Sequence, residues 1–331
     1  MKKKIFVLTI LCIMFITGCG KEVKKESKGN EENNMPKVEE KIEIVDLESD
    51  TRPYAVVINN FPSAVKVQTG LNDAYMVYEF PVEGNMTRSL ALYKDKDTAK
   101  VGTVRSARHN FLDYALENDA IFVHFGWSHY AQGQISSLGI NNINGLSDAP
   151  FWRENPEGLA TEHTAYTSLV KCRETAQNKG YRLTTDKKVP LEYTNEEINL
   201  NGDIANNVNI TYSSAYKVDY KYNEETMLYT RYVNGIKHTD YFTNEDYTTK
   251  NILILTTEFS YASDGYYLEI NNIGTGNGYY ITNGSVKKIT WTKPDRASQT
   301  TYKYEDGTEV KINDGNTYIM LRASYQNVSF N

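Results

Sequence analysis

Short apolar runs that alternate with helical patterns restrict the fold of this chain more than any other feature. Ala55–Ile58 is a continuous apolar run followed by "NNFP", as expected of a strand that is covered on both faces and leads into a loop. Helices are predicted after Ser106, after Ser128 and after Thr167. Residues 51–180 are therefore predicted to form a mixed sheet with helices packed on it. Further strand-like runs lie at 74–80, 89–93 and 120–125.

The second half of the chain has a different pattern. Residues 221–331 contain short runs rich in tyrosine and threonine, and Asn234-Gly235, Asn283-Gly284 and Asp306-Gly307 separate such runs. Asn-Gly and Asp-Gly pairs between strands favour tight hairpins. The polar stretch 181–220 is predicted to be a linker or an exposed excursion. The predicted fold class is α+β: an N-terminal mixed α/β sheet domain followed by a mostly antiparallel β domain.

The first fifty residues predict a location. A basic start, an apolar run at 5–16 and "ITGC" at 16–19 are typical of a bacterial lipoprotein signal peptide, 1–19, after which Cys19 is acylated. The alternative is an ordinary signal peptide with an incidental cysteine. Residues 20–50 are too polar to form a core and predict a disordered tether. The expected location is the outer face of the cell membrane, with the lipid anchor in that membrane.

Cysteine usage and charge exclude two classes of protein. With Cys12 removed and Cys19 lipidated, only Cys172 remains, so no internal disulfide is expected. Cys172 lies at helical spacing from Leu169 and Ala176, which predicts a packed apolar side chain and not a nucleophile. The net charge is −6 and no broad basic face is evident, so nucleic acid is not expected as a partner.

Three arginines are candidates for an anion site. In "VGTVRSARHNFL", a helix that starts near Ser106 would place Arg108 in its first turn on the apolar side. Arg105 can reach the same region, and strand alternation in "TRSLALY" puts Arg88 on the side of the leucines. Guanidinium groups near a helix start suit a phosphate or a carboxylate. The same helical phase places the following side chains away from the apolar side: His109, Asn110, Asp113 and Glu117.

Two other interpretations of these arginines remain open. The carboxylates of Asp73, Glu79 and Glu83 could pair with them inside the fold or act as an acid or base, and Arg105 could simply be exposed.

Several loops add candidate residues that would form an aromatic-rimmed cleft if they met at one edge of the sheet. Trp152, Arg153 and His163 are candidate ligand contacts, although burying a tryptophan under a loop is the commoner use. His124 continues a strand, so it is either a core histidine or a general base. No nucleophile elbow, P-loop, HExxH or paired CxxC motif is present, and neither a metal nor a cofactor is predicted.

Several motifs together resemble one known family. "RPYAVVINNFPSA", "GLNDAYMVYEFPVEGNMTRSLALY", "VGTVRSARHNFLDYALENDAIFVHFGWS", "HTAYTS", "GTGNGYYITNGSVKKITW" and "DGNTYIML" are similar to the YerB-like lipoproteins, from about Arg52 to near the C-terminus. The resemblance implies a two-domain lipoprotein of Gram-positive envelopes, of unknown function.

Two functions are compatible with these features. The first is binding of an anionic cell-wall ligand in an arginine-lined cleft, with any reaction left open. The second is a non-catalytic scaffold or protein-interaction module that uses the tyrosine-rich C-terminal domain to hold an envelope protein.

Overall fold

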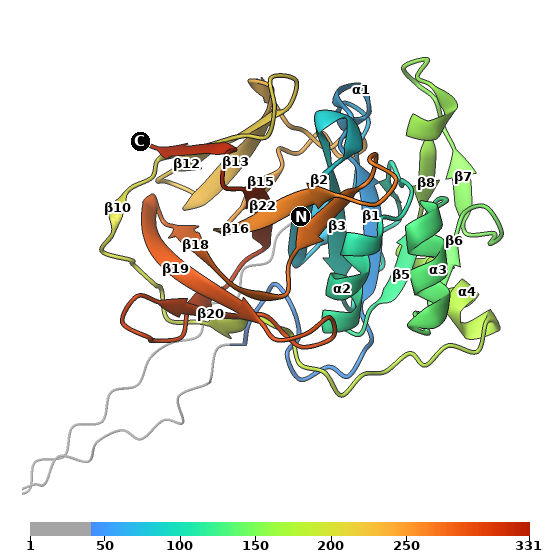
Figure 1. Ribbon diagram of the computed structural model, residues 1–331, viewed down its shortest axis with the longest axis horizontal. Coiled ribbons are helices and arrows are strands. Elements are labelled where there is room, and N and C mark those ends of the chain that lie inside the picture. The colour runs from blue at the N-terminus through green and yellow to red at the C-terminus, as the bar shows by residue number, and fades with distance from the viewer. Residues whose placement is uncertain (1–40) are drawn as a thin grey trace, which may run out of the picture. The chain divides into compact units, whose positions relative to one another are not determined.

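The computed structural model describes residues 41–331, so the predicted signal peptide, Cys19 and most of the tether lie outside the described residues. Its largest element is a 12-stranded mixed sheet built from both halves of the chain (Figure 1). In spatial order its main path is β10 (Asp203–Ile204), β19 (Ser285–Lys293), β18 (Gly274–Thr282), β16 (Asn251–Tyr261), β22 (Thr317–Ala323), β2 (Met76–Val82), β3 (Met86–Tyr93), β1 (Tyr54–Asn59), β5 (Ile121–His124) and β6 (Asn142–Asn144). Off this path, β17 (Leu268–Asn271) pairs with β16 and β20 (Thr301–Tyr304) pairs with β19.

Strand β22 joins the two halves. It pairs in parallel with β2 on one side and with β16 on the other, so that Met76 and Asn251 both lie opposite Thr317. The sheet therefore continues without a break from the N-terminal strands into the C-terminal ones. The mixture of parallel and antiparallel strands with few helices confirms the predicted α+β class.

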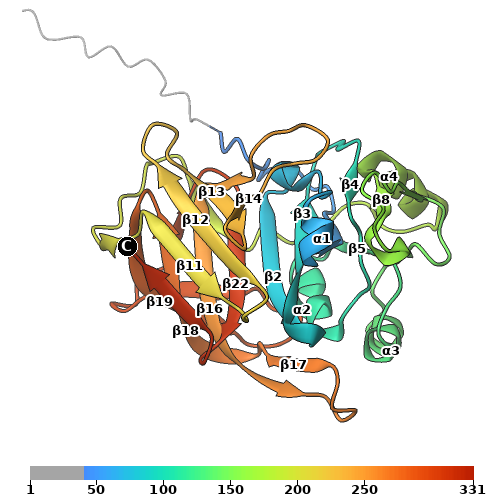
Figure 2. The same cartoon turned by 90° about the horizontal axis from the view of Figure 1, so that it is seen from above.

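Both faces of this sheet are covered, which explains the continuous apolar runs of its strands. One face packs against α2 (His109–Glu117) and α3 (His129–Ser137). The other packs against α1 (Pro62–Val65), α4 (Leu169–Asn178) and a six-stranded sheet (Figure 2). That second sheet contains β14 (Ile236–Lys237), β13 (Leu228–Val233), β12 (Lys217–Asn223), β11 (Asn207–Thr211), β23 (Asn327–Phe330) and β15 (Thr248–Thr249).

Two small sheets and three 3₁₀ turns complete the described chain. The sheets are β4 (Val101–Gly102) with β8 (Ala165–Thr167) and β7 (Phe151–Arg153), and β9 (Glu192–Thr194) with β21 (Lys311–Asn313). The turns are η1 (Leu71–Asp73), η2 (Glu83–Asn85) and η3 (Thr161–His163). The stretch 181–220 contributes β9, β10 and β11. Within residues 41–331, no helix is long and apolar enough to cross a membrane.

The predicted Asn-Gly hairpins are present. Asn234 and Gly235 have φ of 50° and 78° between β13 and β14, and Asn283 and Gly284 have φ of 49° and 71° between β18 and β19. Positive φ at both central residues defines the turn whose twist suits a hairpin, and asparagine and glycine tolerate it best.

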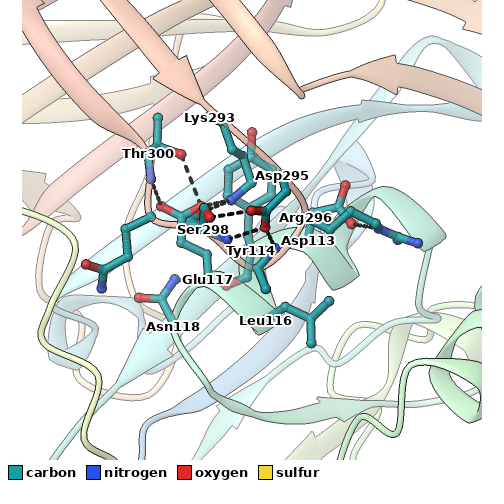
Figure 3. Close-up of polar contacts among 12 residues, drawn as sticks. Asp113, Tyr114, Leu116, Glu117, Asn118, Lys293, Asp295, Arg296, Ser298 and Thr300 are labelled. Carbon is teal, nitrogen blue, oxygen red and sulfur yellow. Dashed lines mark hydrogen bonds and ion pairs between the residues drawn. The ribbon is translucent and has the colours of Figure 1, made fainter.

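Helix α2 differs from the prediction in two respects. It begins at His109, with Arg108 in an extended conformation before it, so the helical phase assigned to Arg108 was wrong. The side predicted to be polar is also buried, because strands of the C-terminal half cover it. Glu117 pairs with Lys293 at 2.8 Å and Asp113 pairs with Arg296 from the β19–β20 loop (Figure 3). Buried charges of this kind need such partners.

Candidate functional site: an arginine cluster at the sheet edge

The site lies at one edge of the large sheet. β1 and β2 both run antiparallel to β3, and β5 runs parallel to β1, so the carboxyl ends of β1, β2 and β5 share this edge. Asn59 at the end of β1 lies opposite Arg88 near the start of β3, and the β2–β3 turn holds Glu83. In sheets with parallel strands, ligands commonly bind outside the carboxyl ends.

Glu83 and Arg108 form the strongest pair in this cluster. Nε of Arg108 lies 3.0 and 2.9 Å from the two carboxylate oxygens of Glu83, and one of its terminal nitrogens also donates to Glu83. Burial raises the pKa of Glu83, but the hydrogen bonds and charge of Arg108, with the charge of Arg88, outweigh it and lower that pKa overall. Glu83 is therefore ionised at neutral pH and compensates one guanidinium.

Arg88 is buried beside the same carboxylate but has a weaker partner. It donates to the backbone oxygen of Ser106, and its contact with Glu83 is 3.4 Å. Burial and then the positive charge of Arg108 lower the pKa of Arg88 well below its usual value. Arginine stays protonated in proteins, so a lowered pKa means that the positive charge of Arg88 is poorly compensated.

Arg105 is the least constrained of the three arginines. It donates to the backbone oxygen of Glu162 at 3.1 Å, and the nearest carboxylate oxygen of Glu162 is 3.9 Å away. Burial lowers the pKa of Arg105. The negative charge of Glu162 raises this pKa in part, and the positive charge of Arg108 lowers it further. The Glu162 side chain is 53% exposed, so water screens much of its attraction.

His163 presents a hydrogen-bond donor beside these arginines. Asn59 Oδ1 accepts from the backbone N–H of Phe61, so the amide nitrogen of Asn59 faces Nδ1 of His163 at 2.8 Å. Nδ1 must then accept, which places the proton of the neutral ring on Nε2. Burial and then the charge of Arg105 lower the pKa of His163 and keep the ring neutral. Its ring stacks on Phe61 at 4.8 Å.

Arg153 lies near this cluster on a neighbouring strand. It donates to the side-chain oxygen of Thr164 at 3.1 Å and to the backbone oxygen of Thr161, and its guanidinium covers the ring of Phe125. The positive charge of Arg153 contributes to lowering the pKa of Arg105, so the two cations repel each other. The adjacent Trp152 instead stacks on Tyr166, and strand alternation turns it away from Arg153.

The other candidate residues do not join this cluster. Asp73 lies at the opposite end of β2, where it accepts from Thr98 at 2.6 Å. Glu79 is completely buried and pairs with Arg231 of the six-stranded sheet. The contacts of these two carboxylates therefore do not support the predicted pairing with Arg88, Arg105 or Arg108, and Glu83 alone of the three carboxylates forms it.

Two further groups considered in the sequence, His124 and Cys172, are buried. The His124 side chain is fully buried and donates from Nδ1 to the backbone oxygen of Gly126; burial lowers its pKa to about 4. The Cys172 side chain is completely buried on α4, which confirms the packed apolar role, and burial raises the pKa of its thiol to about 12. Among residues 41–331, no group of three or more His, Cys, Asp or Glu side chains is arranged to hold a metal ion.

Sequence reasoning missed four residues of the site: Asn59, Phe61, Glu162 and Tyr267. The first two occur in "NNFP" directly after a buried strand, a position where strand ends meet a ligand edge, so a signal was present. Tyr267 lies under the guanidinium of Arg108, with 5.1 Å to its ring centroid, and comes from the C-terminal half. Nothing local in the sequence connects it with Arg108.

This arrangement defines a class of protein: an α+β protein with a cation-rich cluster at the carboxyl ends of its sheet strands. Comparison with known proteins gives the family. Residues 42–182 and 208–319 match the N-terminal and C-terminal domains of a family described as "Protein of unknown function (DUF3048)", and the chain belongs to this family of YerB-like proteins.

A sequence match and a structural match to the same relative confirm that resemblance. The chain is 32% identical over 275 residues to a protein of Bacillus subtilis (strain 168) described as "Putative lipoprotein YerB", a match that covers 81% of this chain and 77% of that protein. A crystal structure of the YerB protein from Bacillus subtilis superposes with a TM-score of 0.75 at 30% identity, over 85% of this chain and 94% of that one.

Proposed function

We propose that this protein binds an anionic ligand of the cell envelope, bearing phosphate or carboxylate groups, at the cluster of Arg88, Arg105 and Arg108. One observation carries the proposal: Arg88 and Arg108 share one buried carboxylate, Glu83, and the nearest carboxylate of Arg105, that of Glu162, is 3.9 Å away and exposed. A bound anion would supply the missing negative charge, and guanidinium groups bind such oxygens in pairs.

The balance of charges supports binding over a purely structural role. If the arginines existed only to stabilise the fold, each would be expected to have a close carboxylate, as Arg231 has in Glu79. Arg88 and Arg105 instead have contacts of 3.4 and 3.9 Å. The neutral His163 adds an N–H donor at the same edge, so cations and a donor lie together without an equal number of carboxylates.

Arg105→Gln is the sharpest test because Arg105 contributes least to internal pairing. Calorimetric titration with pyrophosphate should give an affinity about tenfold lower for this variant than for the wild type, the effect of losing one charged contact. Arg173→Gln is the matched control, since Arg173 also pairs with a single exposed carboxylate, Asp97, and lies away from the cluster. Its affinity should be unchanged.

The opposite result is equally clear. If wild type binds neither pyrophosphate nor a polycarboxylate such as citrate, and Arg105→Gln lowers only the melting temperature, the arginines are structural and the proposal fails.

The proposal places the protein on the outer face of the cell membrane, held by acylated Cys19. The lipobox-like sequence and the lipoprotein name of the Bacillus relative support this location. Cys19→Ser should abolish incorporation of labelled palmitate and release the protein from the membrane fraction. Cys172→Ser, a change at a buried and unreactive thiol, should leave both unchanged. Labelling of Cys19→Ser equal to wild type would contradict the anchor.

The protein-interaction alternative rests on fewer side chains than the tyrosine content suggests. Most tyrosines of the C-terminal half are buried in the two cores or packed against them in a partly buried position. The large exposed aromatic side chains in this half are Tyr241, Phe242, Tyr261, Tyr266 and Tyr325. The last three line one groove, which gives the exposed aromatics a different interpretation.

A further inference from the structure

A groove next to the arginine cluster gathers exposed tyrosine rings. It has a volume of about 300 Å³, and its rim carries Tyr261, Tyr266 and Tyr325, whose exposed fractions are 66%, 58% and 78%. These are three of the six large exposed aromatic side chains of the described residues, gathered from two separate segments. Exposed apolar area concentrated in this way marks a binding surface.

Two loops of the C-terminal half build the groove. The β16–β17 hairpin, which projects beyond the other strands in Figure 2, supplies Tyr261 and Tyr266. The turn between β22 and β23 supplies Tyr325. The hairpin is anchored to α2 because Asn110 donates to the backbone oxygen of Leu268 at 2.7 Å and accepts from Ile270. The hairpin backbone is thus held against α2, the helix that Arg108 directly precedes.

The groove borders the arginine cluster at Glu83. Glu83 and the turn that follows it line the groove, and the carboxylate of the same residue accepts from Arg108. On the other wall, the rings of Tyr266 and Tyr267 lie with their centroids 5.0 Å apart. The guanidinium of Arg108 lies over the ring of Tyr267. A ligand with its anionic group at the arginines would therefore extend over the tyrosines.

We propose that this groove holds the sugar rings of the ligand, so that the ligand is an anionic saccharide. This inference rests on the function proposed above. A pyranose has a face of C–H groups that packs on an aromatic ring and an edge of hydroxyls that needs polar partners, and tyrosine meets both needs. Asn85 and Gln326 add amide groups to the same lining.

The test uses the triple variant Tyr261→Ala/Tyr266→Ala/Tyr325→Ala in the whole chain. All three side chains are largely exposed, so the fold should be retained. The probes are a panel of hexose and N-acetylhexosamine oligomers, each as the neutral sugar, the 1-phosphate and the uronic acid form, with pyrophosphate as the anion alone. Tyr241→Ala, at an exposed tyrosine outside the groove, is the matched control.

The expected result is that the triple variant binds the preferred phosphorylated or uronic acid oligomer at least about tenfold more weakly, and binds pyrophosphate as the wild type does. Tyr241→Ala should match the wild type with both probes. Equal binding of the oligomer by triple variant and wild type would overturn the sugar groove but leave the anion site intact.

Two further outcomes separate the sources of failure. If wild type binds neutral oligomers, loses them in the triple variant and binds no anion, the arginine proposal fails while the sugar groove stands. If no member of the panel binds, and vesicles of phosphatidylglycerol are captured by the wild type but not by the triple variant, the groove is a lipid contact and the inference is overturned.

Discussion

The carboxylate of Glu79 accepts a hydrogen bond of 2.8 Å from the guanidinium of Arg231, and both side chains are almost completely buried between the two large sheets. Glu79 belongs to β2 and Arg231 to β13, so this pair joins the N-terminal strands to the six-stranded sheet. Thr87 donates to the other oxygen of Glu79, and Nδ1 of His238 lies 2.7 Å from Arg231. The pair therefore lies within a connected polar network.

Removing one member of this pair should destabilise the protein strongly. Arg231→Met leaves the carboxylate of Glu79 buried without a cation and should lower the free energy of unfolding by about 3–5 kcal/mol. The double variant Glu79→Leu/Arg231→Met removes both charges and should lose less than the sum of the single changes. Urea unfolding of the four proteins measures this coupling. Additive losses would show that the two charges do not depend on each other.

Glu83→Gln should change stability and ligand binding in opposite directions. The carboxylate compensates Arg108 and Arg88, so its loss should lower the melting temperature. The same loss removes a negative charge beside the proposed anion and should raise the affinity for pyrophosphate roughly tenfold. Calorimetric titration and thermal unfolding of the same sample measure both effects. A weaker affinity would mean that Glu83 positions the arginines more than it competes with the ligand.

The sequence predicts those parts of the fold that depend on local patterns. Strand runs, the start of α3 after Ser128, the end of α4 before Gly180 and the Asn-Gly hairpins follow from periodicity and from backbone preferences of single residues. It does not predict that β22 inserts between β2 and β16, because pairing between strands some 240 residues apart leaves no local signal.

The sequence also predicts only those features of the site that depend on local patterns. The burial of Arg88 follows from strand alternation, and the burial of Cys172 from helical spacing. The environment of α2 does not follow from local patterns, because the C-terminal segments that cover Asp113 and Glu117 are remote in the sequence. Of the three candidate carboxylates, only the structure distinguishes Glu83, since all three lie in or beside β2 and the choice depends on where along this strand each lies and what packs against it.

His124 should make the stability of the protein depend on pH. Its folded pKa of about 4 lies below the ordinary value near 6.5, so the unfolded chain binds more protons between these values and stability falls as the pH decreases through this range. The contribution is about 3 kcal/mol between pH 7 and pH 4. His124→Gln should be less stable at pH 7 but lose less on acidification, measured by urea unfolding at each pH. Parallel curves for the two proteins would contradict a neutral buried ring.

Cys172 should be inert in the native state. Burial raises the pKa of its thiol to about 12, and the side chain is inaccessible. In a Cys12→Ser/Cys19→Ser background, iodoacetamide at pH 8 should leave the folded protein unmodified over hours, and should modify the thiol quantitatively in 6 M guanidinium chloride. Rapid modification of the folded protein would show that α4 opens locally or that the thiol is activated.

His163 provides a test of the site that does not depend on the ligand's own protons. Sulfate is fully ionised above pH 5, so any pH dependence of its binding comes from the protein. Because burial and Arg105 lower the pKa of His163, sulfate affinity should be nearly constant from pH 8 to pH 6.5 and should rise below that range as the ring gains a proton and a positive charge. His163→Gln keeps an N–H donor but cannot titrate, so its sulfate affinity should remain flat down to pH 5.5 in the same calorimetric titration. A rise centred above pH 6.5 in the wild type would mean that the ring is not held neutral beside Arg88 and Arg105, and a rise retained in His163→Gln would assign the proton to another group.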